Sequence, residues 1–203
     1  MEVDTLNWEN TSITFACHLC RSVHMRIAIL LFSLALGAFS FADEKDWKQT
    51  LKAELPRMGH RNWIVIADSA YPLQSGTGIE TVTTRANHLD VAKTIFDMLE
   101  KSNHIRPVIH LDSELPFVPE SDAKGVDSFR QELKTLLKDR KVESLPHEDI
   151  IARLDKAGKT FKVLVIKTPL AIPYTSLFLE LDCGYWGPES EKKMREAIKA
   201  KAK

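Results

Sequence analysis

The stretch WIVIA, residues Trp63–Ala67, decides the fold class of this 203-residue chain. Five apolar residues follow one another without polar alternation, and three of them are β-branched. Such a run is typical of a strand in a sheet that other elements cover on both faces. Polarity returns at Asp68, where we expect the strand to end.

Helical patterns and short apolar runs alternate along the rest of residues 43–203. Apolar residues at helical spacing predict helices, and short apolar runs between polar segments predict strands. The expected helices are 47–55, 86–101, 126–139 and 147–156, and the further strands are 107–111, 162–167 and 176–182. This order predicts a single α/β domain with a largely parallel central sheet flanked by helices. The charged tail, 189–203, is expected to form a solvent-facing helix.

Residues 25–42 have the three parts of a secretory signal peptide. Arg26 supplies a cation, an uncharged apolar run follows, and the triplet Ser40-Phe41-Ala42 places small residues where signal peptidase requires them. The apolar run is shorter than the roughly 20 residues that span a bilayer core, which favours cleavage over a membrane anchor. We therefore expect a periplasmic or secreted protein that meets a membrane only during export.

Residues 1–24 are interpreted as an over-extended or discarded N-terminal extension. They contain Cys17 and Cys20, but no second half-site with zinc-ligand spacing follows, so no metal site is expected. Without the leader, Cys183 is the only cysteine, which excludes an intramolecular disulfide in the mature domain. The 28 basic and 28 acidic residues balance and form no basic stripe. A nucleic-acid partner is therefore not expected.

Two residues suited to proton transfer and ligand binding flank the first predicted strand. His60 precedes the strand and Asp68 ends it, so the strand, at about 3.3 Å per residue, separates them. They share a site only if a loop folds back or if a second copy supplies one of them. Two other polar residues look unremarkable: His88 falls on the polar side of helix 86–101 and is expected to be solvated, and Asp112 is expected to open a polar loop.

Residues 58–72, MGHRNWIVIADSAYP, resemble the amino-terminal signature of the D-ribose pyranase and L-fucose mutarotase family. That signature is a Met/Leu-Gly-His motif, an apolar strand, an Asp and a Pro soon afterwards. Residues 173–179, PYTSLFL, resemble the family's Pro-Tyr-Ala-Asn motif and its following strand, and His147-Glu148 opens a helix as in the ribose enzymes. The three matches occur in family order. Ser176 stands where the family has Asn, and Ser69 where it often has Gly.

The resemblance implies a sugar mutarotase or pyranase-like isomerase that interconverts anomers or ring forms of a free monosaccharide without a metal or organic cofactor. It implies that His60 is the general acid/base, and that Asp68, His147, Tyr174 and Ser176 bind the sugar. It also implies a homo-oligomer with sites at subunit boundaries. The serine replacements leave an alternative open: a non-catalytic exported protein that binds a small sugar-like ligand on the same fold.

Overall fold

Six strands form one sheet in the computed structural model, which describes residues 46–201. Their order across the sheet is β2-β5-β1-β6-β3-β4. The strands are β1 Trp63–Ala67, β2 Ile79–Thr83, β3 Ile105–Asp112, β4 Val142–Leu145, β5 Val163–Lys167 and β6 Leu177–Cys183. Strand β5 is parallel to β1 and β2, and β3 is parallel to β4, whereas β6 is antiparallel to β1 and β3. The largely parallel α/β sheet expected from the sequence is confirmed.

This topology gives the sheet two distinct ends. At one, here called the carboxyl end, β1 to β5 finish and β6 begins; the opposite one is called the amino end. Residues that follow β1, β3 and β5 therefore come close to residues that precede β6. Residues just before β1 lie at the amino end instead.

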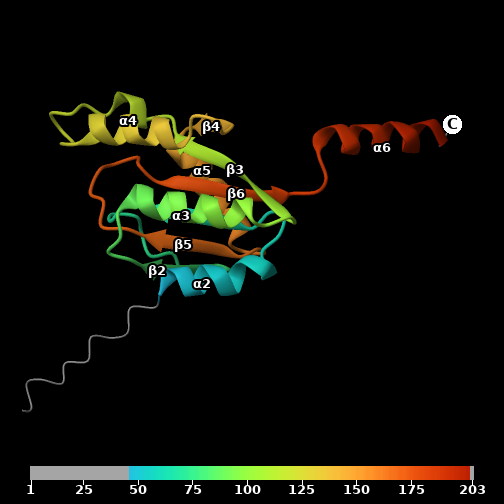
Figure 1. The fold of residues 1–203 in the computed structure, drawn as a ribbon, viewed down its shortest axis with the longest axis horizontal. Coiled ribbons are helices and arrows are strands. Elements are labelled where there is room, and N and C mark those ends of the chain that lie inside the picture. The colour runs from blue at the N-terminus through green and yellow to red at the C-terminus, as the bar shows by residue number, and fades with distance from the viewer. Residues whose placement is uncertain (1–45, 202–203) are drawn as a thin grey trace, which may run out of the picture. The chain divides into compact units, whose positions relative to one another are not determined.

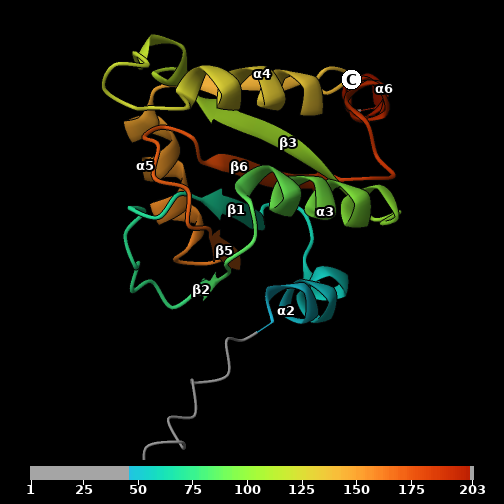
Figure 2. The ribbon, with the colours of Figure 1, turned by 60° about the vertical axis from the view of Figure 1, so that its left-hand side comes forward.

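Helices cover both faces of the sheet (Figures 1 and 2). Helices α2 Trp47–Glu54, α3 His88–Glu100 and α4 Val126–Leu136 pack on one face, and α5 His147–Ala157 packs on the other. Short 3-10 helices occupy Leu55–Arg57 and Leu115–Phe117. Helix α6, Pro188–Lys201, has no buried residue, as its charged sequence predicts.

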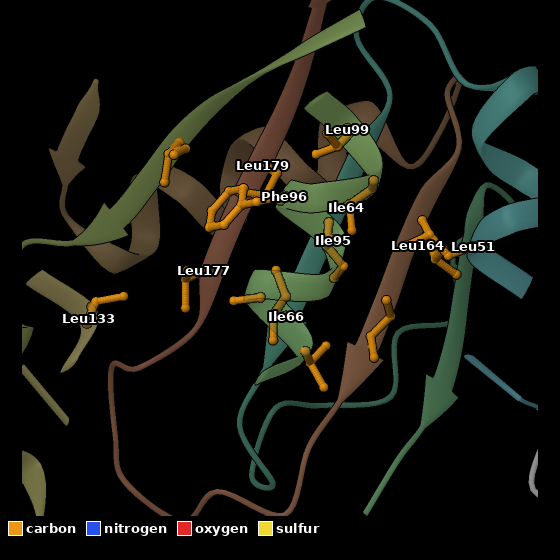
Figure 3. Packing of buried hydrophobic residues seen from close by; sticks show 14 of the residues in the cluster. Leu51, Ile64, Ile66, Ile95, Phe96, Leu99, Leu133, Leu164, Leu177 and Leu179 are labelled. Atoms are coloured by element: carbon orange, nitrogen blue, oxygen red, sulfur yellow. The ribbon is translucent and has the colours of Figure 1, made fainter. Parts of the chain in front are cut away.

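Strand β1 is buried along its whole length, as its uninterrupted apolar sequence predicts. Ile64 and Ile66 pack against α3 beside Ile95, and Phe96 of the same helix lies next to Leu179 of β6 (Figure 3). Val65 belongs to the second cluster, on the α5 face. Complete burial of each such side chain contributes about 1.5–3 kcal/mol. The strand that carries Asp68 to the carboxyl end is therefore a fixed part of the core.

Strands β2 and β4 were not expected from the sequence. Both are outermost in the sheet, and most of their residues are only partly buried. An outer strand needs few apolar residues, so its sequence carries a weak pattern. The expected signal peptide, 25–42, and extension, 1–24, lie outside the described residues. Among residues 46–201, no helix has the length and apolar character needed to cross a membrane.

Candidate active site at the carboxyl end of the sheet

Polar side chains gather at the carboxyl end of the sheet. Asp68 follows β1, Asp112 ends β3, Thr168 follows β5, and Ser176 immediately precedes β6. Helices α3 and α5 also begin at this end, because they follow β2 and β4. Ligands of open α/β sheets bind beyond the carboxyl ends of the strands. This end of the sheet is therefore the candidate site.

Asp68 and Ser176, both predicted sugar ligands, are in direct contact. Ser176 Oγ donates to Asp68 Oδ2 at 3.0 Å, and the backbone N–H of Ala70 donates to Asp68 Oδ1 at 2.8 Å. The contact follows from the topology, since Asp68 leaves β1 where its antiparallel neighbour β6 begins. The carboxylate is held in one orientation, and its remaining lone pairs can accept hydrogen bonds from ligand hydroxyls.

His147 is held at the first position of α5 by two acidic residues. Its Nδ1 lies 3.1 Å from Asp112 Oδ1. Its backbone N–H donates to the Glu114 carboxylate, 3.0 and 3.2 Å from the two oxygens. Pro146, which precedes the helix, provides no side-chain cap, so Glu114 supplies the acceptor that the helix terminus needs. The His147 side chain stays 32% exposed, so a ligand can reach it.

Tyr174 packs edge-on against His147. The ring centroids are 5.7 Å apart, and the ring planes meet at 82°. Tyr174 has a φ of +59°, a left-handed conformation that is unusual for a residue other than glycine. Such conformations are concentrated at ligand-binding sites. The two predicted ligands from α5 and from the loop before β6 are thus brought together.

Asp112 is a buried carboxyl group that the sequence did not mark as functional. Its side chain is 0% exposed, and its Oδ2 has no hydrogen-bond partner among the described residues. Burial raises its pKa to about 6, and the hydrogen bond with His147 acts in the opposite direction. Burying an oxygen without a hydrogen-bond partner costs free energy of folding. Asp112 Oδ2 can still accept a hydrogen bond from a further group.

His88 was expected to be solvated, and this expectation was wrong. The side chain is only 3% exposed, because it begins α3 at the carboxyl end and packs edge-on against Phe129 of α4. Its Nδ1 lies 2.7 Å from Thr168 Oγ1, and its Nε2 has no hydrogen-bond partner among the described residues. Burial lowers the pKa of His88 to about 4, while the Thr175 main chain and the Asp68 charge act in the opposite direction.

The separate contacts belong to one electrostatic cluster. Burial is the main cause of the raised pKa of Asp112, and the negative charge of Asp68 raises that pKa further. The same charge acts on His88. Asp68 is thus close enough to influence both groups. With Glu114, which binds the His147 main chain, the carboxyl end therefore holds three carboxyl groups and two histidines, His88 and His147.

His60, the predicted acid/base residue, does not lie in this cluster. It precedes β1 at the amino end, and the five residues of β1 alone extend about 16 Å. Its side chain is 60% exposed, and the nearest acidic group is Asp182, whose Oδ1 lies 3.8 Å from His60 Nε2. No loop folds back to bring His60 to Asp68 within one copy of the described chain.

The described residues differ from the side-chain arrangements that bind metal ions. Within residues 46–201, no three His, Cys, Asp or Glu side chains are arranged to hold a metal ion. The cluster at the carboxyl end instead offers hydrogen-bond donors and acceptors, which suit the hydroxyl groups of a small polar ligand.

Comparison with known proteins places the chain in a family. The model of the RbsD / FucU transport protein family matches residues 47–183. The chain belongs to this family. The resemblance to the D-ribose pyranase and L-fucose mutarotase family is therefore confirmed, and RbsD / FucU membership supports a sugar mutarotase or pyranase-like function at a coarse level.

Solved structures of RbsD / FucU proteins are similar to the chain at low identity. RbsD of Bacillus subtilis, complexed with D-ribose, is 22% identical, with a TM-score of 0.45, over 66% of this chain and 91% of that one. FucU of Bifidobacterium longum is 20% identical, with a TM-score of 0.45, over 66% and 94%. The fucose mutarotase of Streptococcus pneumoniae, in complex with L-fucose, is 19% identical, with a TM-score of 0.45, over 70% and 97%. No curated protein matches the chain.

Proposed function

We propose that this protein interconverts the anomers or ring forms of a free monosaccharide by histidine acid/base catalysis, without a metal or organic cofactor. The observation that carries the proposal is the pair formed by His147 and the buried Asp112, beside the Asp68–Ser176 contact. RbsD / FucU membership supports the same class of reaction.

The reaction needs two proton transfers. Opening a cyclic sugar requires a proton at the ring oxygen and removal of the proton from the anomeric hydroxyl. Because an ionised carboxylate only accepts hydrogen bonds, Asp112 selects the His147 tautomer with hydrogen on Nδ1. His147 Nε2 then carries a lone pair that can take the anomeric proton, and histidine titrates in the range where either transfer is feasible.

The remaining groups of the cluster are assigned to binding. Asp68 accepts hydrogen bonds from the sugar hydroxyls. Ser176, whose hydroxyl proton is donated to Asp68, accepts a further one through Oγ. The Tyr174 phenol, whose ring packs against His147, adds a third polar contact. While these groups hold the hydroxyls, the open chain rotates and closes again. Rotation of the aldehyde group exchanges anomers, and closure through a different hydroxyl exchanges ring forms.

His60 enters the proposed mechanism from a neighbouring copy. We assign it the proton transfer at the ring oxygen, in a homo-oligomer whose sites lie at subunit boundaries. Its exposure and its position at the amino end, away from Asp68, support this arrangement. A head-to-tail contact between copies joins two different surfaces, and it closes into a ring when the rotation permits.

Magnetisation-exchange NMR on free pentoses and hexoses tests the function. The purified protein is expected to raise anomer or ring-form exchange above the spontaneous rate for at least one sugar, and His60→Ala is expected to remove the gain while leaving ligand affinity largely intact. Exchange at the spontaneous rate for every sugar, together with sugar binding by calorimetry, would instead support the non-catalytic binding protein.

We also propose that this function is exerted outside the cytoplasm, after cleavage of a signal peptide at residues 25–42. The sequence of charge, apolar run and small residues supports export. Amino-terminal sequencing of the exported protein is expected to find a start at Asp43. Retention of residues 25–42 in a soluble intracellular protein would contradict this part of the proposal.

A further inference from the structure

A concave region lies at the amino end of the sheet, next to His60. This cavity has a volume of about 560 Å³ and lies between α5 and the start of β1. Its lining includes His60, Arg61, Trp63, Arg153 and Lys156. The volume falls in the range that small ligands occupy in proteins. The cavity thus adjoins the one predicted catalytic residue that the carboxyl-end cluster lacks.

The cavity carries an excess of positive charge. Arg61, Arg153 and Lys156 line it, and none of the three forms an ion pair within the described residues. The single acidic residue in its lining, Glu180, is engaged with the buried His110, whose Nε2 lies 3.3 Å from Glu180 Oε2. Three cations and one carboxylate therefore line the cavity, which leaves it an excess of positive charge.

Arg61 occupies a backbone conformation that disfavours a side chain. Its φ is +77°, in the left-handed region where glycine is free and other residues are strained. The conformation is fixed by its backbone N–H, which donates to the Leu181 carbonyl oxygen at 2.9 Å. The guanidinium lies 5.8 Å from the centroid of the Phe161 ring, and no acceptor within the described residues occupies its N–H groups. Such conformations are concentrated at active sites and ligand-binding sites.

We infer that the sugar on which this protein acts carries an anionic group, a carboxylate or a phosphate, and that the cavity beside His60 binds that group. The inference rests on the proposed function, because it assigns the cavity to the same substrate as His60. A guanidinium binds the oxygens of carboxylate and phosphate in pairs, and a nearby ammonium adds a point charge.

The opposite charges at the two ends of the sheet determine the orientation in which the sugar binds. Asp68 and Asp112 at the carboxyl end would repel an anion but accept hydrogen bonds from hydroxyls. Arg153 and Lys156, on the last turns of α5, lie at the amino end with His60. In a site at a subunit boundary, the copy that supplies His60 therefore also supplies these cations, and they contact the anionic end of the sugar.

Matched pairs of sugars test the inference in the full-length oligomer. D-galacturonate is compared with D-galactose, and D-glucose 6-phosphate with D-glucose, by magnetisation-exchange NMR and by calorimetry. The anionic member of at least one pair is expected to have a kcat/KM about tenfold or more above its neutral partner. The pair with the larger preference identifies carboxylate or phosphate as the group recognised.

The double variant Arg153→Gln/Lys156→Gln is expected to lower this preference about tenfold. The matched control Lys93→Gln/Lys134→Gln removes two exposed cations from α3 and α4 and is expected to leave the preference unchanged. Catalysis of neutral and anionic sugars at equal kcat/KM would overturn the inference and leave the proposed function standing. Equal loss of all exchange together with dissociation of the oligomer in the double variant would overturn it too, because the cations would then hold the copies together.

A different result separates the inference from the proposed function. If no sugar exchanges above the spontaneous rate, the proposed isomerase activity fails. D-galacturonate or D-glucose 6-phosphate binding by calorimetry, abolished in Arg153→Gln/Lys156→Gln but not in the control, would still support the anion site. If neither anionic sugar binds, the inference of an anion site is wrong.

Discussion

His147 Nδ1 lies 3.1 Å from Asp112 Oδ1, which joins the first residue of α5 to the last residue of β3. The carboxyl group is fully buried and the imidazole is not. One partner is therefore rigid and shielded from water, whereas the other can reach a ligand. This arrangement suits an acid/base histidine whose tautomer and orientation are set by a carboxylate.

The first prediction concerns this pair. Asp112→Asn keeps the size of the side chain but no longer selects the His147 tautomer, so kcat is expected to fall about 100-fold, the size of a typical acid/base contribution. KM is expected to change little, because Asp112 acts through His147. Exchange rates measured against pH by NMR check this, and the exposed Asp139→Asn serves as control. An unchanged kcat in Asp112→Asn would exclude His147 as an acid/base residue that depends on this carboxylate.

The second prediction is that Asp112 costs stability at neutral pH. Its pKa is raised from 3.8 to about 6, mainly by burial, so the folded state binds the proton more tightly than the unfolded state. The contribution of Asp112 to the free energy of unfolding is complete below pH 3.8 and is lost as pH rises through 6, a change of about 3 kcal/mol. Asp112→Asn removes this titration. Relative to the wild type, the variant is expected to gain unfolding free energy between pH 4 and pH 7, in urea titrations at fixed protein concentration.

The third prediction is that His88 has the opposite pH dependence. Its pKa is lowered from 6.5 to about 4, again mainly by burial, so the folded state favours the neutral ring. The contribution of His88 to the free energy of unfolding is present above pH 6.5 and is lost as pH falls through 4, a change of about 3 kcal/mol. His88→Gln is expected to gain stability relative to the wild type as pH falls from 7 to 4. A parallel pH dependence in wild type and variant would show that His88 titrates normally.

In the wild type, the effects of these two titrations on the free energy of unfolding are expected to cancel in large part. As pH falls from about 6.5 to about 4, the titration of Asp112 raises the free energy of unfolding and that of His88 lowers it. The wild-type stability is therefore expected to change less across this interval than that of either single variant. The double variant, Asp112→Asn/His88→Gln, is expected to restore a weak pH dependence.

The fold was predictable because its central strands are buried on both faces. The run at β1 is short, has no polar residue and is rich in β-branched residues, which favours a strand, and every one of its side chains is buried. Helices α3 and α5 likewise bury one face each. Strands β2 and β4 escaped prediction because outer strands are partly exposed and lack this pattern.

The candidate site was predictable only where local motifs mark it. Asp68, His147, Tyr174 and Ser176 lie in segments that resemble family motifs. His88 was missed because its burial depends on Phe129 and Thr168, which are distant in sequence. Asp112 did carry a signal: it ends an apolar strand, as Asp68 does, and the carboxyl ends of parallel strands meet at one end of a sheet.

The fourth prediction tests whether each site combines residues from two copies. His60→Ala and His147→Ala are each expected to be inactive in sugar exchange. When they are co-expressed with different affinity tags and purified as mixed oligomers, about a quarter of the head-to-tail boundaries will pair an intact His60 with an intact His147. About a quarter of the wild-type exchange rate is therefore expected to return. Mixed oligomers of His60→Ala with His60→Ala/His147→Ala contain no intact His60 and provide the control. If the first mixture stays as inactive as this control, although both tags are present in one oligomer, His60 and His147 do not act together across a subunit boundary.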